Sequence, residues 1–289
     1  MSPLTSAATT GLLFAVVGFL SFAVPQAAPA ALLLHYSFDE SASGSLPALD
    51  GGAAPPAPGT FVGAAERTGN TPGGFSVGAL DIDQPNSFVT AGDVDKLDGL
   101  SQLTLAGWLN LQAAPGHGNR IMSKQDATSF GGFSFALNNP TEGAAERRAD
   151  NFQLNMALGG DGGFTFNTSG ADLDADNTWI FVAVTYDGTT AANNLKFYWG
   201  DPLTPVAQLG ADLSSTSGQL PSLTQEFKVG AQSEGTVSPP AWFDDIRVYD
   251  EVLDLEALDG IRLANVPEPG ALALLAIGGA LCLARRRSV

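Results

Sequence analysis

The central part of this sequence predicts an all-β fold, a two-sheet antiparallel β-sandwich. Apolar and polar residues alternate along eight short segments, which is the period of a half-buried strand. Clusters of Gly, Asn, Asp and Pro separate these segments and favour turns. One short stretch, 254–263, has a helical pattern. Many strands with almost no helix indicate two packed antiparallel sheets in a single domain.

Each predicted strand follows from its own pattern. The first places alternate residues from Leu32 to Phe38 on one face, and the others repeat this period. Turns are expected at 138–140 and 187–188, and an Ala/Pro/Gly run over 53–63 predicts an irregular loop. The predicted strands are 32–38, 103–111, 133–137, 151–158, 180–186, 195–199, 227–229 and 246–248.

Residues 1–30 have the features of a cleavable secretory signal peptide. An apolar run covers 11–24, and Ala28-Pro29-Ala30 offers a small-residue cleavage site. No Lys or Arg precedes the apolar run, so an uncleaved anchor or a misassigned start codon is the alternative. We expect the folded domain to span residues 31–265.

Residues 266–289 have the features of a processing signal. They begin with the motif Val266-Pro267-Glu268-Pro269-Gly270 (266–270), continue with an uncharged apolar run over 271–284, and end in Arg285-Arg286-Arg287 (285–287) and two further residues. The prolines stop an upstream helix, and the arginines favour a cytoplasmic C-terminus. The run is short for a full span, which needs ~17–25 residues. We expect a hydrophobic sorting helix that holds the chain in the membrane before processing; a buried C-terminal helix of the domain is the alternative.

This tail resembles the PEP-CTERM sorting signal of Gram-negative and related bacteria. Motif, apolar run, basic cluster and terminal position agree over about the last 24 residues. The resemblance implies that an exosortase, a membrane transpeptidase-like enzyme, recognises the tail. It also implies that the protein reaches the cell surface or the exopolysaccharide matrix.

Charge and cysteine usage exclude several classes of function. The chain carries 13 Lys and Arg against 30 Asp and Glu, a net charge of −17, which repels nucleic acid. The single cysteine, Cys282, lies in the tail, so no disulfide can form within 31–265. Only two histidines, His35 and His117, are present, which leaves little for a histidine-based zinc site.

Seven segments of the central part carry recognisable motifs in a fixed order. They are His35–Glu40, Ala79–Asp83, Leu103–Trp108, Arg120–Lys124, Trp179–Gly188, Leu195–Gly200 and Phe243–Tyr249 with Leu253. In this order they resemble a laminin-G-like, concanavalin A-like jelly roll. The resemblance implies about 12–14 strands and leaves the ligand open, because this fold serves lectin, protein-binding and spacer roles. Trp199-Gly200-Asp201 departs from the Val-Asp-Gly of many members, which puts the shape of that hairpin in doubt.

A structural Ca²⁺ is one hypothesis for the acidic residues of these motifs. Asp244 is two and four residues from the apolar Ile246 and Val248, so in a strand without a bulge it lies on their face and points inward. A carboxylate buried there needs a cation or hydrogen-bond donors. Ca²⁺ takes six to eight oxygens, and Asp39 and Asp83 are the expected co-ligands. The alternative is that Asp244 accepts backbone N–H groups of neighbouring loops.

A second acidic run is interpreted as a solvated loop. Asp172, Asp174 and Asp176 have the spacing of the first half of an EF-hand loop. Asn177 and Ala183 stand where that loop needs glycine and glutamate. We expect no metal there.

Exposed aromatic residues are the candidates for glycan binding, because sugars stack on aromatic faces. Trp242 follows a proline-rich turn, and Tyr198 has the opposite parity to the apolar Phe197, so both are candidate ligand-binding residues. For each, core or hairpin packing is the alternative. Trp108 and Trp179 are expected in the core.

The sequence predicts a non-catalytic binding module, lectin-like toward exopolysaccharide or surface glycans. It contains no pair of carboxylates at a spacing that a strand would fix, and no motif of a serine hydrolase, a zinc protease or a P-loop enzyme. A structural matrix protein without a small ligand is the alternative, and a glycan-active enzyme is the third hypothesis.

Overall fold

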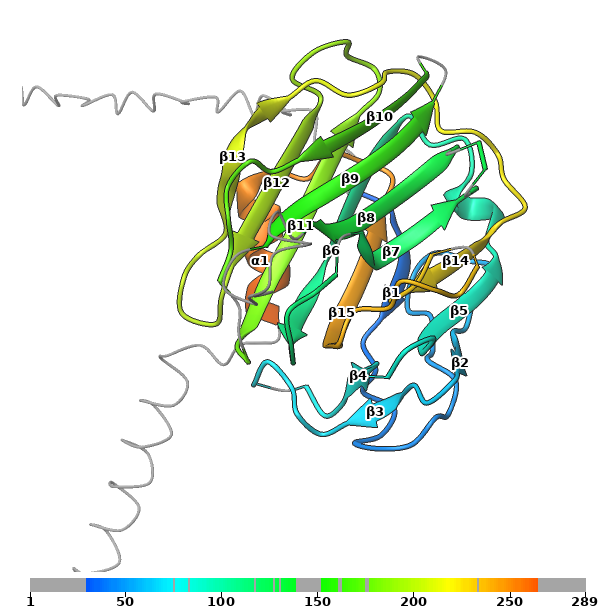
Figure 1. Ribbon diagram of the computed structural model, residues 1–289, viewed down its shortest axis with the longest axis vertical. Helices are drawn as coiled ribbons and strands as arrows, with labels where there is room; N and C mark the ends of the chain where they lie inside the picture. Colours follow the sequence, from blue (N-terminus) through cyan, green and yellow to red (C-terminus); the bar gives the residue numbers. More distant parts are fainter. Residues whose placement is uncertain are drawn as a thin grey trace, which may run out of the picture.

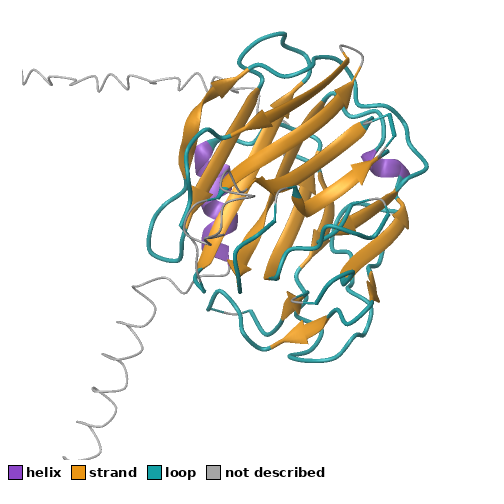
Figure 2. Cartoon of the chain, in the orientation of Figure 1, coloured by secondary structure: helices purple, strands orange, loops and turns teal. Residues whose placement is uncertain are grey.

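The computed structural model describes residues 30–264, apart from 75, 83, 117, 127, 130, 139–151, 161–162, 175–176 and 233. Two antiparallel sheets lie face to face, and loops connect their strands at both ends (Figures 1 and 2). This confirms the predicted all-β sandwich. The expected signal peptide and sorting tail lie outside the described residues. Within the described part of the chain, no helix has the length and apolarity needed to cross a bilayer.

The larger sheet has eight strands in the order β13-β12-β11-β6-β15-β4-β3, with β1 also paired to β15. Its two central strands, β6 and β11, align from Asn110 opposite Trp179 to Gln102 opposite Asp187. The strands are β1 (Leu32–Tyr36), β3 (Glu66–Thr68), β4 (Ala79–Asp81), β6 (Gln102–Leu111), β11 (Trp179–Asp187), β12 (Leu195–Gly200), β13 (Ala207–Leu213) and β15 (Ala241–Tyr249).

The smaller sheet has seven strands in the order β10-β9-β8-β7-β14-β5-β2. A short 3₁₀ helix, η1 (Asp95–Leu97), follows β5, and a single α-helix, α1 (Leu255–Ala264), closes the described chain. The strands are β2 (Thr60–Val62), β5 (Phe88–Asp93), β7 (Asn119–Gln125), β8 (Gly132–Asn138), β9 (Gln153–Gly160), β10 (Gly163–Thr168) and β14 (Glu226–Val229).

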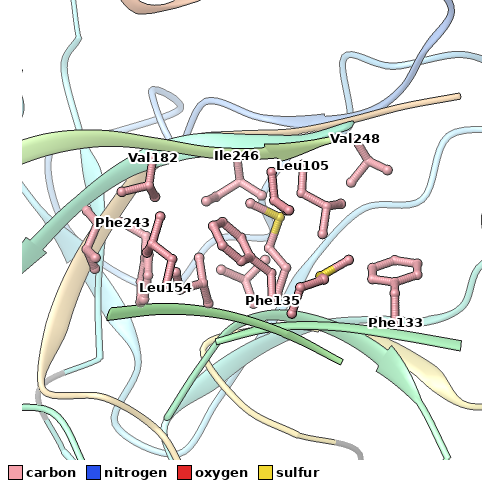
Figure 3. Close-up of a cluster of buried hydrophobic side chains, with 14 of the residues drawn as sticks. Leu105, Phe133, Phe135, Leu154, Val182, Phe243, Ile246 and Val248 are labelled. Atoms are coloured by element: carbon pink, nitrogen blue, oxygen red, sulfur yellow. The ribbon is translucent and has the colours of Figure 1, made fainter. Parts of the chain in front are cut away.

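The main hydrophobic core lies between the two sheets (Figure 3). Alternate residues of each strand face it, for example Leu154 on one sheet and Val182 on the other, both fully buried. Phe135 stacks on Phe197 across the core, with ring centroids 6.4 Å apart. The period-2 pattern of the sequence is thereby confirmed for strands of both sheets.

A second apolar cluster covers the outer face of the larger sheet. Helix α1 packs there through Leu258 and Ile261, against side chains that include Trp108, Phe181 and Tyr198. Asp254 caps the helix by accepting the Ala257 N–H at 2.9 Å, as short polar residues commonly do at helix N-termini. The predicted short helix is confirmed within one residue at each end. Because both faces of β6 and β11 are covered, every residue from Trp179 to Tyr186 is buried.

Edge strands and a bulge account for the differences from the predicted strands. Strand β13 is mostly exposed and pairs only with β12, so no apolar alternation marks it in the sequence. Strand β10 likewise pairs only with β9. In β1 the register shifts between Leu32 and Leu34, which places Leu33 in the main core and Leu32 against the outer cluster. The expected shared face for Leu32 and Leu34 is therefore wrong.

Candidate functional site

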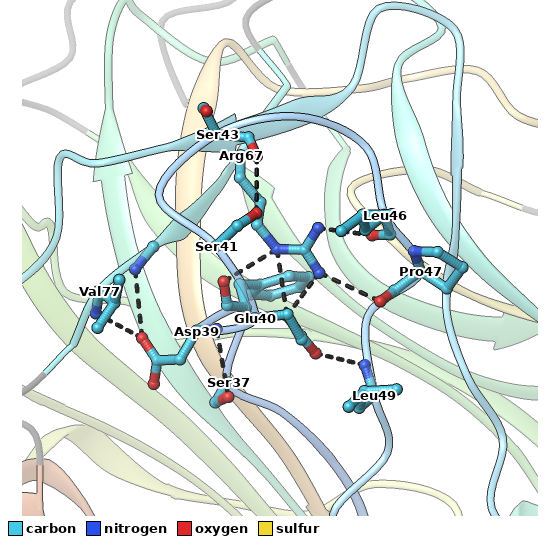
Figure 4. A network of polar contacts seen from close by, with 12 residues as sticks. Ser37, Asp39, Glu40, Ser41, Ser43, Leu46, Pro47, Leu49, Arg67 and Val77 are labelled. Carbon is cyan, nitrogen blue, oxygen red and sulfur yellow. Dashed lines mark hydrogen bonds and ion pairs between the residues drawn. The ribbon is translucent and has the colours of Figure 1, made fainter.

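Loop 69–78, between β3 and β4, is fastened at its C-terminal end by two carboxylates from distant parts of the chain. Ser76 Oγ lies 2.7 Å from Asp244 Oδ2 and 3.2 Å from Asp39 Oδ1. Asp39 Oδ1 also accepts the N–H groups of Val77 (2.5 Å) and Gly78 (3.2 Å), as Figure 4 shows for Val77. The structure thus brings together two of the three predicted metal ligands. The third, Asp83, lies outside the described residues.

A β-bulge determines which way Asp244 points. The register of β15 against β6 shifts between Asp244 and Arg247, and Asp245 takes a left-handed φ of 50°. Asp244 pairs with Trp108, which belongs to the outer cluster, whereas its neighbour Phe243 packs in the main core. Asp244 is fully buried, but it faces the outer side of the sheet. The inward direction predicted from parity is wrong, because that parity holds only for a strand without a bulge.

The surroundings of Asp244 disfavour its negative charge. Burial raises the pKa of this carboxyl well above its ordinary value, and the neighbouring Asp245 and Asp39 carboxylates raise it further. Hydrogen bonds from Ser76 and from the Asp245 N–H oppose this rise without cancelling it. A cation held between Asp244 and Asp39 would offset the cost of burying this charge and the repulsion between the two carboxylates.

The groups around these two carboxylates fit a hard cation such as Ca²⁺. Gly78 O lies 3.4 Å from Ser76 Oγ, and a Cβ built on Gly78 would lie 2.7 Å from Phe38 O and 2.3 Å from Ser41 O. Oxygen atoms of two carboxylates and a hydroxyl thus meet at Ser76, and the carbonyls of Phe38 and Ser41 lie beside the neighbouring Gly78. Oxygen atoms of these kinds are the ligands of Ca²⁺. Each carboxylate also accepts a backbone N–H, as the capping alternative expects.

Buried Arg67 fixes the backbone on both sides of Asp39 (Figure 4). Its Nε donates to Phe38 O at 3.0 Å, and its Nη2 lies 2.5 Å from Glu40 Oε2. Its Nη1 donates to Leu46 O at 2.5 Å. Phe38 has a φ of 57°, a strained conformation for a bulky residue, which this network holds in place.

A second acidic group, not anticipated from the sequence, surrounds a buried lysine. One carboxylate oxygen each from Asp93, Asp95 and Asp98 lies within 4.8 Å of the others. Lys124 Nζ lies 2.7 Å from Asp93 Oδ1 and 3.3 Å from Asp98 Oδ1, and the lysine is 1% exposed. It also donates to the carbonyls of Leu223 and Gln225. This ammonium group is the counter-ion of Asp93 and Asp98, so we assign the cluster a structural role.

Replacing Lys124 with Met should lower the free energy of unfolding by about 2–4 kcal/mol, because it leaves Asp93 and Asp98 without their counter-ion. Urea denaturation at neutral pH measures this change. Lys196→Met is the matched control: its pair with Asp212 (3.2 Å) is more than one-third exposed on both sides and should contribute less than ~1 kcal/mol. Equal losses for the two variants would contradict the structural role of Lys124.

At its other end, loop 69–78 borders a pocket of about 420 Å³ at the end of the sandwich. Pro72 forms part of the wall, with Trp179 from the start of β11 and Trp199 near the end of β12. Asp174 and the 93% exposed Leu203 also line it, together with Thr178, Ile180, Asp201 and Pro202. No sequence pattern points to this pocket, because its wall combines the ends of two strands with three separate loops.

The predicted aromatic candidates lie outside this pocket. Tyr198 is 5% exposed and packs in the cluster beneath α1, so its expected exposure is wrong. The helix covers the face that strand parity alone leaves open. Trp242 is half-buried and pairs with Asn110, which in turn pairs with Trp179 on the next strand. Trp108 and Trp179 are buried as expected, though in the outer cluster.

The fold is a two-sheet sandwich in which two carboxylates hold loop 69–78 and a pocket with two tryptophans lies at one end. This is the architecture of a jelly-roll module. The chain belongs to the concanavalin A-like lectin/glucanases superfamily, whose Laminin_G_3 model matches residues 83–258. A PEP-CTERM protein-sorting motif matches residues 265–288, which marks the chain as an exported, surface-sorted protein. A search of curated proteins finds no match.

Solved structures share the fold at low sequence identity. One is domain 4 of AbnA, a GH43 extracellular arabinanase from Geobacillus stearothermophilus, in complex with arabinotriose: TM-score 0.50, 17% identity, covering 80% of this chain and 98% of that one. Another is the botulinum neurotoxin serotype D ligand binding domain with N-acetylneuraminic acid: TM-score 0.50, 12% identity, covering 80% of this chain and 50% of that one. At these identities the likeness concerns the fold alone.

Proposed function

We propose that the protein is a surface-sorted, non-catalytic module that binds neutral glycans in the pocket between Trp179 and Trp199. The observation that carries this proposal is the lining of the pocket. Two indole rings, apolar Ile180 and Leu203, and acidic Asp174 share a space of about 420 Å³, within the usual range for small-ligand sites. The arabinotriose complex of a protein with this fold supports it.

The lining suits hydroxyl-rich, uncharged sugars. Indole faces present apolar surface to the C–H groups of a sugar ring, and carboxylates accept hydrogen bonds from its hydroxyls. Carboxylates at the pocket disfavour acidic sugars, because like charges repel.

Asp201 shapes the pocket and is not suited to acid–base catalysis. Its Oδ1 accepts the N–H groups of Leu203 (2.7 Å) and Thr204 (2.6 Å), and its Oδ2 accepts the Thr204 hydroxyl. Burial acts to raise the pKa of Asp201, but these hydrogen bonds outweigh it and hold the pKa below the ordinary value. The ionised carboxylate thus keeps the 201–204 turn in shape, which supports binding rather than turnover.

We further propose that Ca²⁺ between Asp39 and Asp244 stabilises the pocket wall. Loop 69–78 carries Ser76 and Gly78, which contact Asp244 and Asp39, and also Pro72, which lines the pocket. A cation that holds Ser76 and Gly78 in place therefore limits the motion of Pro72. Glycan binding should therefore depend on Ca²⁺ although the cation does not touch the sugar.

Native electrophoresis of residues 31–265 through gels that contain individual polysaccharides tests the binding proposal. The panel includes the exopolysaccharide of the source organism, neutral glucans and arabinans, and an acidic polysaccharide. We expect retardation by neutral glycans in Ca²⁺ and less retardation in EDTA. Unchanged mobility in every gel would refute glycan binding and favour a structural matrix protein, whereas shortening of a glycan would indicate an enzyme.

Deleting residues 266–289 should release the protein into the medium, because the deletion removes the segment expected to engage exosortase and the membrane. Immunoblots of cell and medium fractions measure the distribution. Changing Arg285, Arg286 and Arg287 to Ser, with the rest intact, is a milder variant that should slow sorting without changing the folded domain. Retention of the tail-less protein on cells would contradict tail-dependent sorting.

A further inference from the structure

Helix α1 runs along β12 toward the pocket end of the sandwich. Its first residues, Leu255 and Glu256, share a surface depression with Lys196, the second residue of β12. Near its last turn, Arg262 packs over Gly200 at the end of the strand, where a Cβ on Gly200 would lie 3.1 Å from the arginine Cδ. In Figure 1 the helix and β12 accordingly lie side by side. The chain therefore leaves the helix at the end that carries the pocket.

Arg262 attaches the helix to the pocket wall. It is 4% exposed, and its Nη1 donates to the carbonyl of Asp201 at 2.9 Å and to that of Pro202 at 3.5 Å. Its Nε donates to Asp259 Oδ1 at 2.7 Å, and the same oxygen accepts the Val206 N–H at 2.8 Å. The end of α1 is thus fixed to the turn that lines the pocket.

The distance from this point to the apolar tail is short. Described structure ends at Ala264, and the uncharged run begins at 271, so six residues, 265–270, connect them. At ~3.5 Å per residue, even a fully extended connection spans only about 20 Å. While 271–284 is held in a bilayer, the pocket end of the domain must stay within roughly that distance of the membrane surface.

We propose that the pocket faces the envelope of the cell that displays the protein, and that its ligand is a neutral polysaccharide of that same envelope. This rests on the proposed glycan site and on a membrane-held tail. Glycans on other cells would have to enter beneath the domain, whereas surface-attached chains of the same cell are already there. A short tether also raises the effective concentration of such chains at the pocket.

Cysteine labelling on intact cells tests this orientation in the full-length protein. In a Cys282→Ser background, Leu203→Cys places a thiol at the pocket, and Ala192→Cys places one on the exposed β11–β12 turn at the opposite end of β12. A large PEG-maleimide cannot enter narrow spaces. We expect it to label Leu203→Cys several-fold more slowly than Ala192→Cys on cells, and both equally in the tail-less proteins recovered from the medium.

Inserting a flexible Gly/Ser linker of about 20 residues after Ala264, which spans ~25 Å, should restore rapid labelling of Leu203→Cys. Equal labelling of the two positions on cells, without the linker, would overturn the orientation. Binding by residues 31–265 is measured separately. If Leu203→Cys is protected on cells but residues 31–265 bind no glycan, the proposed ligand is refuted and the proposed orientation stands. If residues 31–265 bind glycan but both positions are labelled equally on cells, the orientation is refuted and the ligand stands.

Discussion

Adding Ca²⁺ to residues 31–265 at neutral pH should raise the thermal midpoint by about 5–10 °C. A ligand at 100 times its Kd stabilises the folded state by ~2.7 kcal/mol, and in a domain of this size each kcal/mol corresponds to ~2–4 °C. The gain arises because the cation neutralises Asp39 and the buried Asp244, which the fold otherwise holds side by side. Differential scanning calorimetry with Ca²⁺ and with EDTA measures the shift.

Two aspartate variants locate the cation. Asp244→Asn keeps the size and part of the hydrogen bonding of the side chain but removes its charge, so it should abolish the Ca²⁺-dependent shift. Asp95→Asn changes an exposed member of the other acidic cluster and should leave the shift intact. A shift that survives Asp244→Asn and disappears in Asp95→Asn would place the cation at the wrong site for our proposal.

The Ca²⁺ effect should also grow with pH. The pKa of Asp244 in the folded protein is raised, so between the unfolded value, ~3.9, and the folded one the native state holds more protons. Without a cation, the contribution of this group to stability is therefore lost as the pH rises through that window. Ca²⁺ needs the ionised carboxylate, so the stabilisation by Ca²⁺ should be larger at pH 8 than at pH 5. The opposite order would contradict a site at Asp244.

Replacing Trp199 with Ala should weaken binding of neutral glycans about 10–30-fold, which corresponds to ~1.4–2 kcal/mol of lost contact. Trp199 is the less buried of the two pocket tryptophans, so its removal disturbs the core less than removal of Trp179, which is 9% exposed. Trp199→Phe retains an aromatic face and should recover part of the affinity. Titration with oligosaccharides gives Kd, and urea denaturation checks that the variants are folded.

Trp242→Phe is the matched control for this prediction. Trp242 is the aromatic residue that the sequence favours, and it lies two strands from Trp179 on the same face. If the sugar binds in the pocket, Trp242→Phe should leave the affinity unchanged. A loss in Trp242→Phe with no loss in Trp199→Ala would move the glycan site to the outer face of β15.

The sequence predicted best those strands in which every second side chain faces the core. In the central strands β6 and β11, the alternate apolar residues face the main core and the strands form a long ladder, and the family motifs place them in order. Edge strand β13 was missed because most of its side chains are exposed and only Leu209 is buried. The direction of Asp244 was missed because a bulge at Asp245 reverses the parity, and no local pattern marks a bulge.

Of the candidate site, the proximity of Asp39 and Asp244 could be predicted from the sequence, and the pocket could not. Asp39 and Asp244 belong to recognisable strand motifs, so their meeting could be anticipated. The pocket combines Pro72, Trp179 and Trp199, which come together only through the packing of three loops at one end. Tyr198 was misjudged because α1, more than fifty residues later in the chain, covers it. Burial by an element that is distant in the sequence cannot be seen in the apolar and polar alternation of a single strand.

The most direct test of the central proposal is an equilibrium titration of residues 31–265 with neutral oligosaccharides from the exopolysaccharide of the source organism, followed by tryptophan fluorescence in Ca²⁺ and in EDTA. We predict a saturable change in emission that weakens about tenfold or more in EDTA, since loss of the cation frees the loop that carries Pro72. No saturable change in either buffer would contradict a glycan pocket at Trp179 and Trp199.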